Sequence, residues 1–192
     1  PVPFADTEFM AKVEERVVKP TLAGLAAEGI RYVGFIFIGL MNQDGNPWVI
    51  EYNARMGDPE TEAVLPRIES DLVELLLAAA EGRLDDQELK ISEQTAVTTV
   101  LVSGGYPGDY AKGYEISFSE TPPNVTVFHA GTAEKDGSVV TSGGRVLAVT
   151  ALGDSLEAAR AASQSAAELI TFEGKFFRKD IGKDLIQLKI KN

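Results

Sequence analysis

A polar stretch over residues 85–94 divides this chain of 192 residues into two parts with different patterns. Before it, apolar residues recur mainly at helical spacing. After it, short apolar runs alternate with turn residues, which is typical of strands. We therefore expect two α/β units, residues 1–90 and 91–192, joined by a linker.

The N-terminal part is predicted to hold three helices and a β-hairpin. Asp6 or Thr7 can cap the first helix, and Pro20 is expected to kink or split it. Asp58 before Pro59 has the residue types of a helix N-cap and first helical position. The helices are expected over residues 7–28, 59–66 and 70–81, and the paired strands over residues 32–41 and 47–53.

The C-terminal part is predicted to be mainly strands with one long helix. Asp154 and Glu157 form a variant of the capping box, so we expect them to open a helix that ends near residue 170. A strand and a short helical tail should follow within residues 175–190. The strands are expected over residues 96–102, 114–118, 125–130, 139–141 and 145–151.

Composition excludes several classes of function. The net charge of -11 argues against non-specific binding to nucleic acid or to anionic membranes. No apolar run is long enough to cross a membrane, and zero cysteines exclude disulfides and thiol catalysis. We expect a cytoplasmic protein. Because the chain begins at Pro1 rather than Met, we also expect it to be part of a longer polypeptide.

The strand over residues 47–53 carries the strongest candidate site. Because side chains alternate between the two faces of a strand, Glu51 and Asn53 lie on one face, and Arg55 joins them if the strand persists. The Cα atoms of Glu51 and Asn53 would be about 6.5 Å apart. A carboxylate and an amide oxygen suit Mg²⁺ or Mn²⁺, and an arginine beyond them suits a phosphoryl group. From spacing alone, a half-buried strand with a solvated polar face explains the same pattern.

Five further features have mainly structural interpretations. The Gly-rich residues 104–108 lack the Lys-Ser/Thr pair of a P-loop and are predicted to form a turn. His129, the single histidine, is expected to be structural, with a substrate contact as the alternative. Arg145 is expected to belong to a hairpin, and Arg178 with Asp180 to form a surface or interdomain ion pair. Trp48 is expected to lie in the core or at its rim.

The wider sequence resembles the phosphoribosylamine–glycine ligase family, also called glycinamide ribonucleotide synthetase, within the ATP-grasp superfamily. The similarity lies in GFIFIGLMNQDGNPWVIEYNARMGDPETEAVLPRIESDLVELLLAA and in SGGYPGDYAKGYEI, VFHAGT, GGRVLAVTALG and FRKDIG, and it covers essentially the whole chain. The continuation through residues 57–61 and the later motifs distinguish this ligase from other ATP-grasp enzymes.

The resemblance implies that Glu51 and Asn53 hold the Mg²⁺ or Mn²⁺ bound to ATP. It implies transfer of a phosphoryl group from ATP to glycine, then attack by 5-phosphoribosylamine on the glycyl phosphate. Products are glycinamide ribonucleotide, ADP and phosphate, in purine biosynthesis. Arg55 would stabilise charge on the transferred group. Asp58 either caps a helix or orients the ammonium of glycine or the attacking amine.

Family members are longer than this chain, and nothing here resembles their N-terminal half. The resemblance therefore implies an α+β fold in which residues 1–90 form the C-terminal part of an ATP-grasp lobe. Residues 91–192 would form a small, mainly antiparallel domain with one long helix. We expect little ligase activity without the N-terminal half as partner. The alternatives are a binding or scaffold module that kept the fold, or another ATP-grasp carboxylate–amine ligase.

Overall fold

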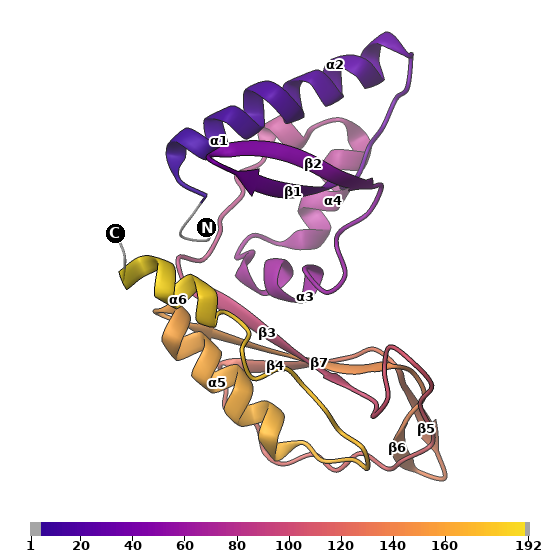
Figure 1. Cartoon of the computed structure of the whole chain (residues 1–192). Coiled ribbons are helices and arrows are strands. Elements are labelled where there is room, and N and C mark those ends of the chain that lie inside the picture. Colours follow the sequence, from indigo (N-terminus) through magenta and orange to yellow (C-terminus); the bar gives the residue numbers. More distant parts are fainter. Residues whose placement is uncertain (1–4, 191–192) are drawn as a thin grey trace. The chain divides into compact units, whose positions relative to one another are not determined.

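The computed structural model describes residues 5–190, with side chains described up to Ile186 (Figure 1). The chain forms two compact units. The first contains the residues up to Gly57 together with Ser70–Lys90, and the second contains Asp58–Glu69 together with Ile91–Ile186. Among the described residues, no helix has the length and apolar character needed to cross a membrane.

The first unit begins with a long helical segment. It comprises α1 (Thr7–Val13), a π-helical turn (Glu14–Val18) and α2 (Lys19–Ala27). Asp6 is the N-cap, as expected, and its Oδ1 accepts a hydrogen bond from the Phe9 N–H at 2.7 Å. Because proline has no N–H to donate, the helical ladder must change near Pro20, and the π-helical turn directly before α2 is that change.

The predicted hairpin is confirmed, although its first strand starts later than expected. Strand β1 (Phe37–Gln43) pairs antiparallel with β2 (Asn46–Asn53). Asp44 and Gly45 form the turn with φ angles of 51° and 74°. A two-residue turn with positive φ at both positions matches the twist of paired strands, which explains why Asp-Gly stands here.

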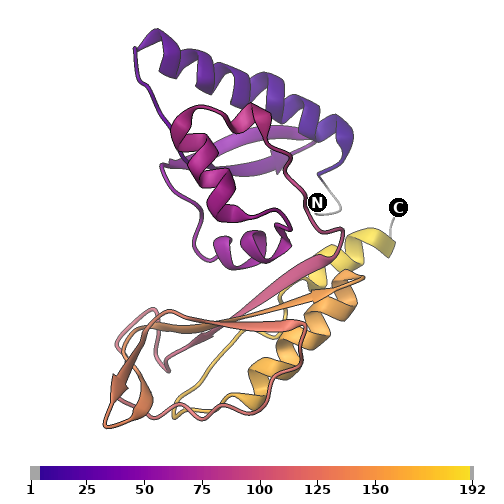
Figure 2. The same ribbon diagram turned by 180° about the vertical axis from the view of Figure 1, so that it is seen from behind.

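Helix α4 (Leu72–Glu81) completes the first unit and lies against one face of the hairpin, as Figures 1 and 2 show from opposite sides. Asp71 caps it by accepting from two backbone N–H groups, and Gly82 ends it with a φ of 71°. Leu75 and Ala78 are buried, whereas Trp48 on β2 is 61% exposed. The expectation that Trp48 lies in the core or at its rim is therefore wrong.

The second unit is built on a three-stranded antiparallel sheet. Its order is β3 (Thr95–Val102), β7 (Arg145–Gly153) and β4 (Val125–His129), so the central strand is the last in sequence. A separate hairpin joins β5 (Thr132–Lys135) to β6 (Ser138–Thr141). The α+β class is confirmed.

Two predicted strands of the second unit are reduced to isolated bridges. The segment over residues 114–118 makes single bridges from Glu115 and Ser117, and the one after residue 175 makes a single bridge from Phe176 to Val102. Neither segment has a long, continuous partner. The predicted C-terminal helix is present as α6 (Lys183–Ile190).

Helix α5 (Leu156–Leu169) covers one face of the sheet. Its N-cap is Ser155, whose Oγ accepts from the Ala158 N–H, so the predicted cap at Asp154 is wrong by one residue. The interface is mostly apolar, with Leu101, Leu147 and other core residues fully buried.

Helix α3 (Thr61–Val64) and a 3-10 turn (Leu65–Arg67) pack on the opposite face of that sheet. The hydroxyl of Thr150 donates to the Glu62 carbonyl at 2.9 Å and fixes α3 to the central strand. The N-cap of α3 is Glu60, and no side chain caps the helix, so the predicted capping role of Asp58 is wrong.

Candidate functional site

Glu51 and Asn53 lie side by side at the end of β2, in the first unit. The Asn53 Nδ2 donates to Glu51 Oε1 at 3.0 Å, so both side chains leave the same face of the strand. Glu51 is exposed and Asn53 is half-buried. Rotation of the amide by half a turn presents its oxygen beside the carboxylate, giving two hard oxygen ligands for one divalent cation.

Gly39 leaves the space that the Glu51 side chain occupies. The two residues are cross-strand partners, and a Cβ on Gly39 would lie 3.1 Å from the Cγ of Glu51. The register shifts directly after this pair, because Leu40 opposes Val49 and leaves Ile50 as an extra residue. Such a bulge redirects the side chains that follow it, and here these are the two candidate ligands.

Within the described part of the chain, no three His, Asp or Glu side chains gather into a metal site. Glu51 and Asn53 alone could supply only part of the coordination sphere of a cation. A partial sphere fits Mg²⁺ or Mn²⁺, because Mg²⁺ takes few protein ligands and completes its coordination with water and substrate phosphates.

Arg55 does not continue the face of Glu51 and Asn53. Strand β2 ends at Asn53, and the Arg55 Nη1 donates to the neighbouring Met56 carbonyl at 2.8 Å. The condition for the predicted alignment, a strand that persists to residue 55, is not met. The guanidinium is exposed on a bend, where it can turn toward an anion without breaking a strand.

Asp58, in the second unit, forms an ion pair with Arg145 at the start of β7. The Arg145 Nη2 lies 2.9 Å from Asp58 Oδ2, and the two side chains are 39% and 56% exposed. Sequence reasoning gave Arg145 only a hairpin role. The pair joins two segments that are 87 residues apart.

A bulge in β7 explains why Arg145 reaches Asp58. Leu147 pairs with Leu101 and Arg145 with Val102, so Val146 is an extra residue. In a regular strand, Arg145 and Leu147 would lie on the same face of the sheet. That face is the buried one, because Leu147 belongs to the core that includes residues of α5. The extra residue moves Arg145 to the other face, where α3 and Asp58 lie.

The loop after β3 packs against the glycines that precede Arg145. The Ser103 N–H donates to the Gly144 carbonyl at 2.8 Å, and its hydroxyl donates to the Gly143 carbonyl at 2.8 Å. A Cβ at Gly144 would lie 2.2 Å from the ring of Tyr106. This Gly-rich loop is therefore a packed turn, as predicted, and it holds the start of β7 in place.

The remaining candidates have structural contacts. His129 Nδ1 lies 3.1 Å from Thr132 Oγ1, and its ring packs on Phe118. Arg178 and Asp180 form the predicted surface ion pair, with two hydrogen bonds. The hydrogen bonds from Arg178 lower the pKa of Asp180 to about 2.

Two family models match this chain. The model described as phosphoribosylglycinamide synthetase, ATP-grasp (A) domain matches residues 1–61, and the one described as phosphoribosylglycinamide synthetase, C domain matches residues 96–184. The chain belongs to the phosphoribosylamine–glycine ligase family. Glu51, Asn53, Arg55 and Asp58 all fall in the first match, whereas Arg145 falls in the second.

Relatives from bacteria and a solved structure agree with this assignment. Phosphoribosylamine–glycine ligase of Chlorobaculum tepidum is 48% identical over 185 residues, which cover 95% of this chain and 44% of the relative. The crystal structure of phosphoribosylamine–glycine ligase from Thermotoga maritima has a TM-score of 0.81 and 39% identity, covering 91% of this chain and 43% of that one. This chain thus spans less than half the length of these relatives.

The fold also resembles that of a more distant enzyme. The crystal structure of Kluyveromyces lactis urea carboxylase superposes with a TM-score of 0.68 at 15% identity, covering the whole of this chain and 17% of that one. At this identity the likeness concerns the fold alone.

Proposed function

We propose that this chain is the C-terminal portion of an ATP-dependent ligase that joins glycine to 5-phosphoribosylamine. The reaction passes through glycyl phosphate and gives glycinamide ribonucleotide, ADP and phosphate, a step of purine biosynthesis. The observation that carries the proposal is the contact between Glu51 and Asn53, within the region matched by the ATP-grasp family model.

Glu51 and Asn53 hold the divalent cation that accompanies ATP, either Mg²⁺ or Mn²⁺. Their oxygens leave one strand face together, and Gly39 gives the carboxylate room. When bound, the metal supplies charge neutralisation for the nucleotide phosphates. Arg55 binds a phosphate oxygen, for which its exposed, forked guanidinium on a bend is suited.

Asp58 orients the ammonium group of glycine or the amine of phosphoribosylamine. Its carboxylate is 56% exposed and is free of the helix-capping role. Arg145 fixes the position of that carboxylate through one oxygen, which leaves the other oxygen to accept from an amine. Arg145 is therefore a positioning residue in this proposal.

The chain alone has little ligase activity, and the N-terminal half of the enzyme is its partner. The relatives are more than twice as long as this chain, and an ATP site needs walls on more than one side. The partner half supplies the rest of the nucleotide site and the remaining contacts to phosphoribosylamine.

Complementation tests this proposal. This chain is mixed with a separately expressed N-terminal half from a family member, and ADP release is followed with glycine and fresh phosphoribosylamine. We expect activity only on mixing, and loss of it with Glu51→Ala. Glu88→Ala is the matched control, because Glu88 is an exposed carboxylate of the same unit with one weak lysine partner.

One outcome would contradict the ligase assignment, and another would contradict the proposed metal site. Mixed halves that associate without activity would favour the scaffold alternative. Mixed halves whose activity is unchanged by Glu51→Ala would show that the metal lies elsewhere.

A further inference from the structure

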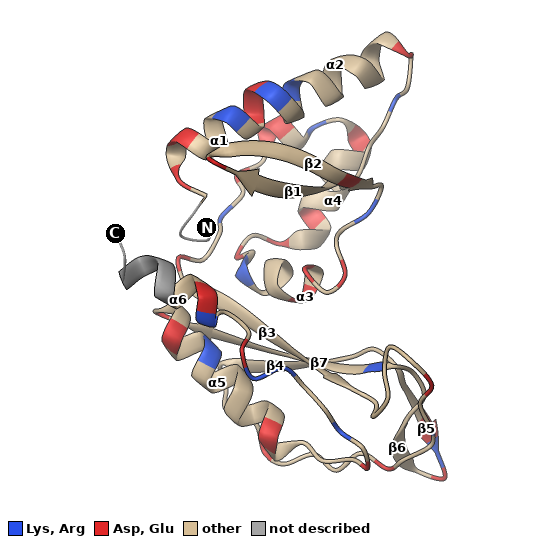
Figure 3. Cartoon of the chain, in the orientation of Figure 1, with Lys and Arg blue, Asp and Glu red and all other residues tan. Residues whose placement is uncertain are grey.

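The segment that carries Asp58 is held by one strand, β7, at two places. At the start of the segment, Arg145 donates to the Asp58 carboxylate at 2.9 Å. Four residues further along the segment, the carbonyl of Glu62 accepts from the Thr150 hydroxyl, also at 2.9 Å. Arg145 is the only charged residue in β3, β4 and β7, the three strands of the sheet (Figure 3). The second contact is therefore a neutral one, made from the interior of the strand.

Helix α3 cannot hold this segment in place by itself. It has only four residues, and no side chain caps it. A helix of one turn is unstable alone, because its nucleation fixes more backbone torsions than its first hydrogen bonds repay. The place of α3, and of Asp58 in the turn before it, therefore depends on contacts with other parts of the second unit.

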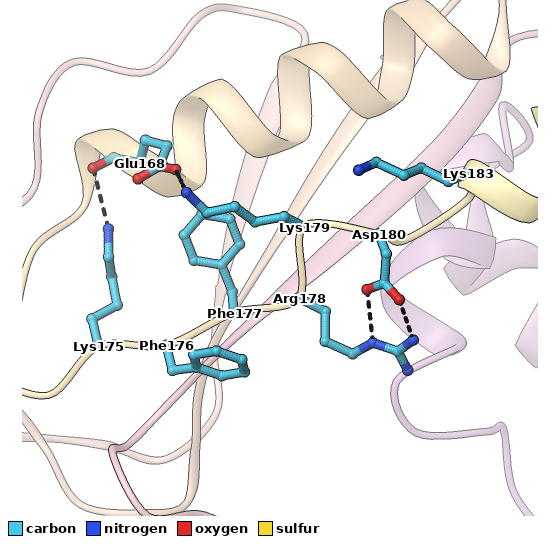
Figure 4. Close-up of a pocket in the computed structure, with 8 residues that line it drawn as sticks. All are labelled: Glu168, Lys175, Phe176, Phe177, Arg178, Lys179, Asp180 and Lys183. Atoms are coloured by element: carbon cyan, nitrogen blue, oxygen red, sulfur yellow. Dashed lines mark hydrogen bonds and ion pairs between the residues drawn. The ribbon is translucent and has the colours of Figure 1, made fainter.

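The two contacts with β7 act over a long separation in sequence. They join residues that are 87 and 88 positions apart. The ion pair of Arg178 and Asp180, drawn in Figure 4, instead joins residues two positions apart and holds only the loop that contains them. Contacts of the long-range kind are the ones that can fix the Asp58 segment on the sheet.

Thr150 is a directed donor in this arrangement. It is 1% exposed, so water cannot replace its hydroxyl as the donor to Glu62. Its cross-strand partner is Thr98 of β3, and the two hydroxyl oxygens lie 2.8 Å apart. A hydroxyl has one proton, and Thr150 gives its proton to the Glu62 carbonyl. Thr98 must therefore donate to Thr150, which keeps the proton of Thr150 directed at Glu62.

A second pair of hydroxyls, on the other face of the sheet, has a different connection. Thr99 and Ser163 lie 2.7 Å apart, and Ser163 also donates to a carbonyl of β7. That pair joins the sheet to α5, on which no candidate site residue lies. The pair of Thr98 and Thr150 instead ends on the segment that carries Asp58.

The far end of the segment is held independently of Thr150. The Ser92 N–H donates to the Arg67 carbonyl, and the Arg67 Nη2 donates to the Ser92 carbonyl, both at 2.7 Å. Loss of the Thr150 contact therefore leaves the segment attached to the unit and frees its first part, where Asp58 lies.

We propose that Thr150, oriented by Thr98, is a positioning residue that fixes where the Asp58 carboxylate lies. Arg145 holds the side chain of Asp58, and Thr150 holds the backbone that follows it. The importance of Thr150 for the reaction rests on the proposed function, in which Asp58 orients an amine. Such a group must be held closely, because a displacement of about 1 Å can cost about 100-fold in rate.

Kinetics of the complemented enzyme test the importance of Thr150 for the reaction. Thr150→Val replaces the hydroxyl with a methyl group of similar shape. We expect kcat/KM for glycine or for phosphoribosylamine to fall about tenfold, as for a displaced orienting group. The KM for ATP should stay unchanged, because the proposed metal ligands lie in the first unit. A loss of folded enzyme would instead lower kcat for every substrate and leave each KM as it was.

Two further variants separate the hydrogen bond from the shape of the side chain. Thr150→Ser keeps the donor, so we expect it to retain the activity that Thr150→Val loses. Thr98→Val leaves the Thr150 donor in place but no longer directs it, so its effect should be smaller than that of Thr150→Val.

NMR of this chain alone tests the position of Asp58 without any ligase activity. With Thr150→Val, we expect shifts in the carboxyl-carbon signal of Asp58 and in the backbone signals of residues 58–62. Ser163→Ala is the matched control, because it breaks a buried hydroxyl pair of the same unit on the α5 face. It should leave the Asp58 signals unchanged.

Each arm can fail separately. Unchanged Asp58 signals in Thr150→Val, or equal shifts in Ser163→Ala, would overturn the positioning proposal. Equal kinetic effects of these two variants in active mixed halves would overturn the importance of Thr150 for the reaction. Shifted Asp58 signals together with inactive mixed halves would support the positioning of Asp58 and contradict the ligase assignment instead.

Discussion

The guanidinium of Arg145 contacts the carboxylate of Asp58, with Nη2 and Oδ2 2.9 Å apart. The contact joins the turn before α3 to the central strand of the sheet on which α3 packs. Both partners are more than one-third exposed, so solvent weakens their attraction. The pair therefore serves geometry more than stability, because it fixes where the Asp58 carboxylate lies.

A double-mutant cycle on Asp58→Asn and Arg145→Gln should separate these roles. We expect each change to lower the free energy of unfolding by less than about 1 kcal/mol, with a coupling energy within the same limit. Urea unfolding of this chain measures both quantities.

In the complemented enzyme, we expect Asp58→Asn to lower kcat/KM for glycine at least tenfold, and Arg145→Lys to retain more activity than Arg145→Gln. Near-normal kinetics of Asp58→Asn would rule out the role of Asp58 in orienting an amine.

Gly39→Val should weaken metal binding without changing a ligand. A side chain at position 39 would press on the Glu51 Cγ, which lies 3.1 Å from the Cβ position, and would turn the carboxylate away from Asn53. We expect several-fold weaker binding of Mn²⁺ in the complemented enzyme with ADP, measured by Mn²⁺ paramagnetic relaxation. Gly24→Ala is the control, because no atom lies within 4 Å of a Cβ at Gly24. Equal effects of the two substitutions would contradict this argument.

The sequence predicted the local elements that depend on local chemistry. The hairpin expected from residues 32–41 and 47–53 is present, and the helix expected over residues 70–81 ends at Glu81. Alternation along the strand predicted that Glu51 and Asn53 share a face, and their hydrogen bond confirms it. Each of these features is decided by a few neighbouring residues.

Features that depend on long-range pairing were not predicted. The partner of Asp58 is 87 residues away, and Arg145 reaches it only because Val146 is an extra residue in β7. A bulge of this kind leaves no mark in the apolar pattern of its strand.

The buried hydroxyl pair of Thr99 and Ser163 should be costly to break on one side only. Their oxygens lie 2.7 Å apart beneath α5, and Ser163 also donates to the Val149 carbonyl at 2.9 Å. Ser163→Ala leaves the Thr99 hydroxyl buried without this partner, so we expect a loss of about 1–3 kcal/mol in the free energy of unfolding.

Adding Thr99→Val should recover part of that loss, because the unpaired hydroxyl is then replaced by a methyl group of similar shape. Thermal or urea unfolding of the two single variants and the double variant measures the recovery. A double variant as unstable as the sum of the single variants would show that the two hydroxyls act independently.

The ion pair between Arg178 and Asp180 should persist in acid. In the folded protein the pKa of Asp180 is about 2, below the ordinary value of 3.8, chiefly because Arg178 donates to its carboxylate. Since the pKa is lowered, the pair's stabilising effect is complete above about pH 4 and is lost as the pH falls toward 2. The pH midpoint of the Asp180 titration can be measured by NMR of its carboxyl carbon.

With Arg178→Gln, we expect this titration midpoint to rise toward the ordinary value, whereas Lys90→Gln should leave it unchanged. A midpoint near 4 in the unmodified chain would show that the pair does not persist in solution.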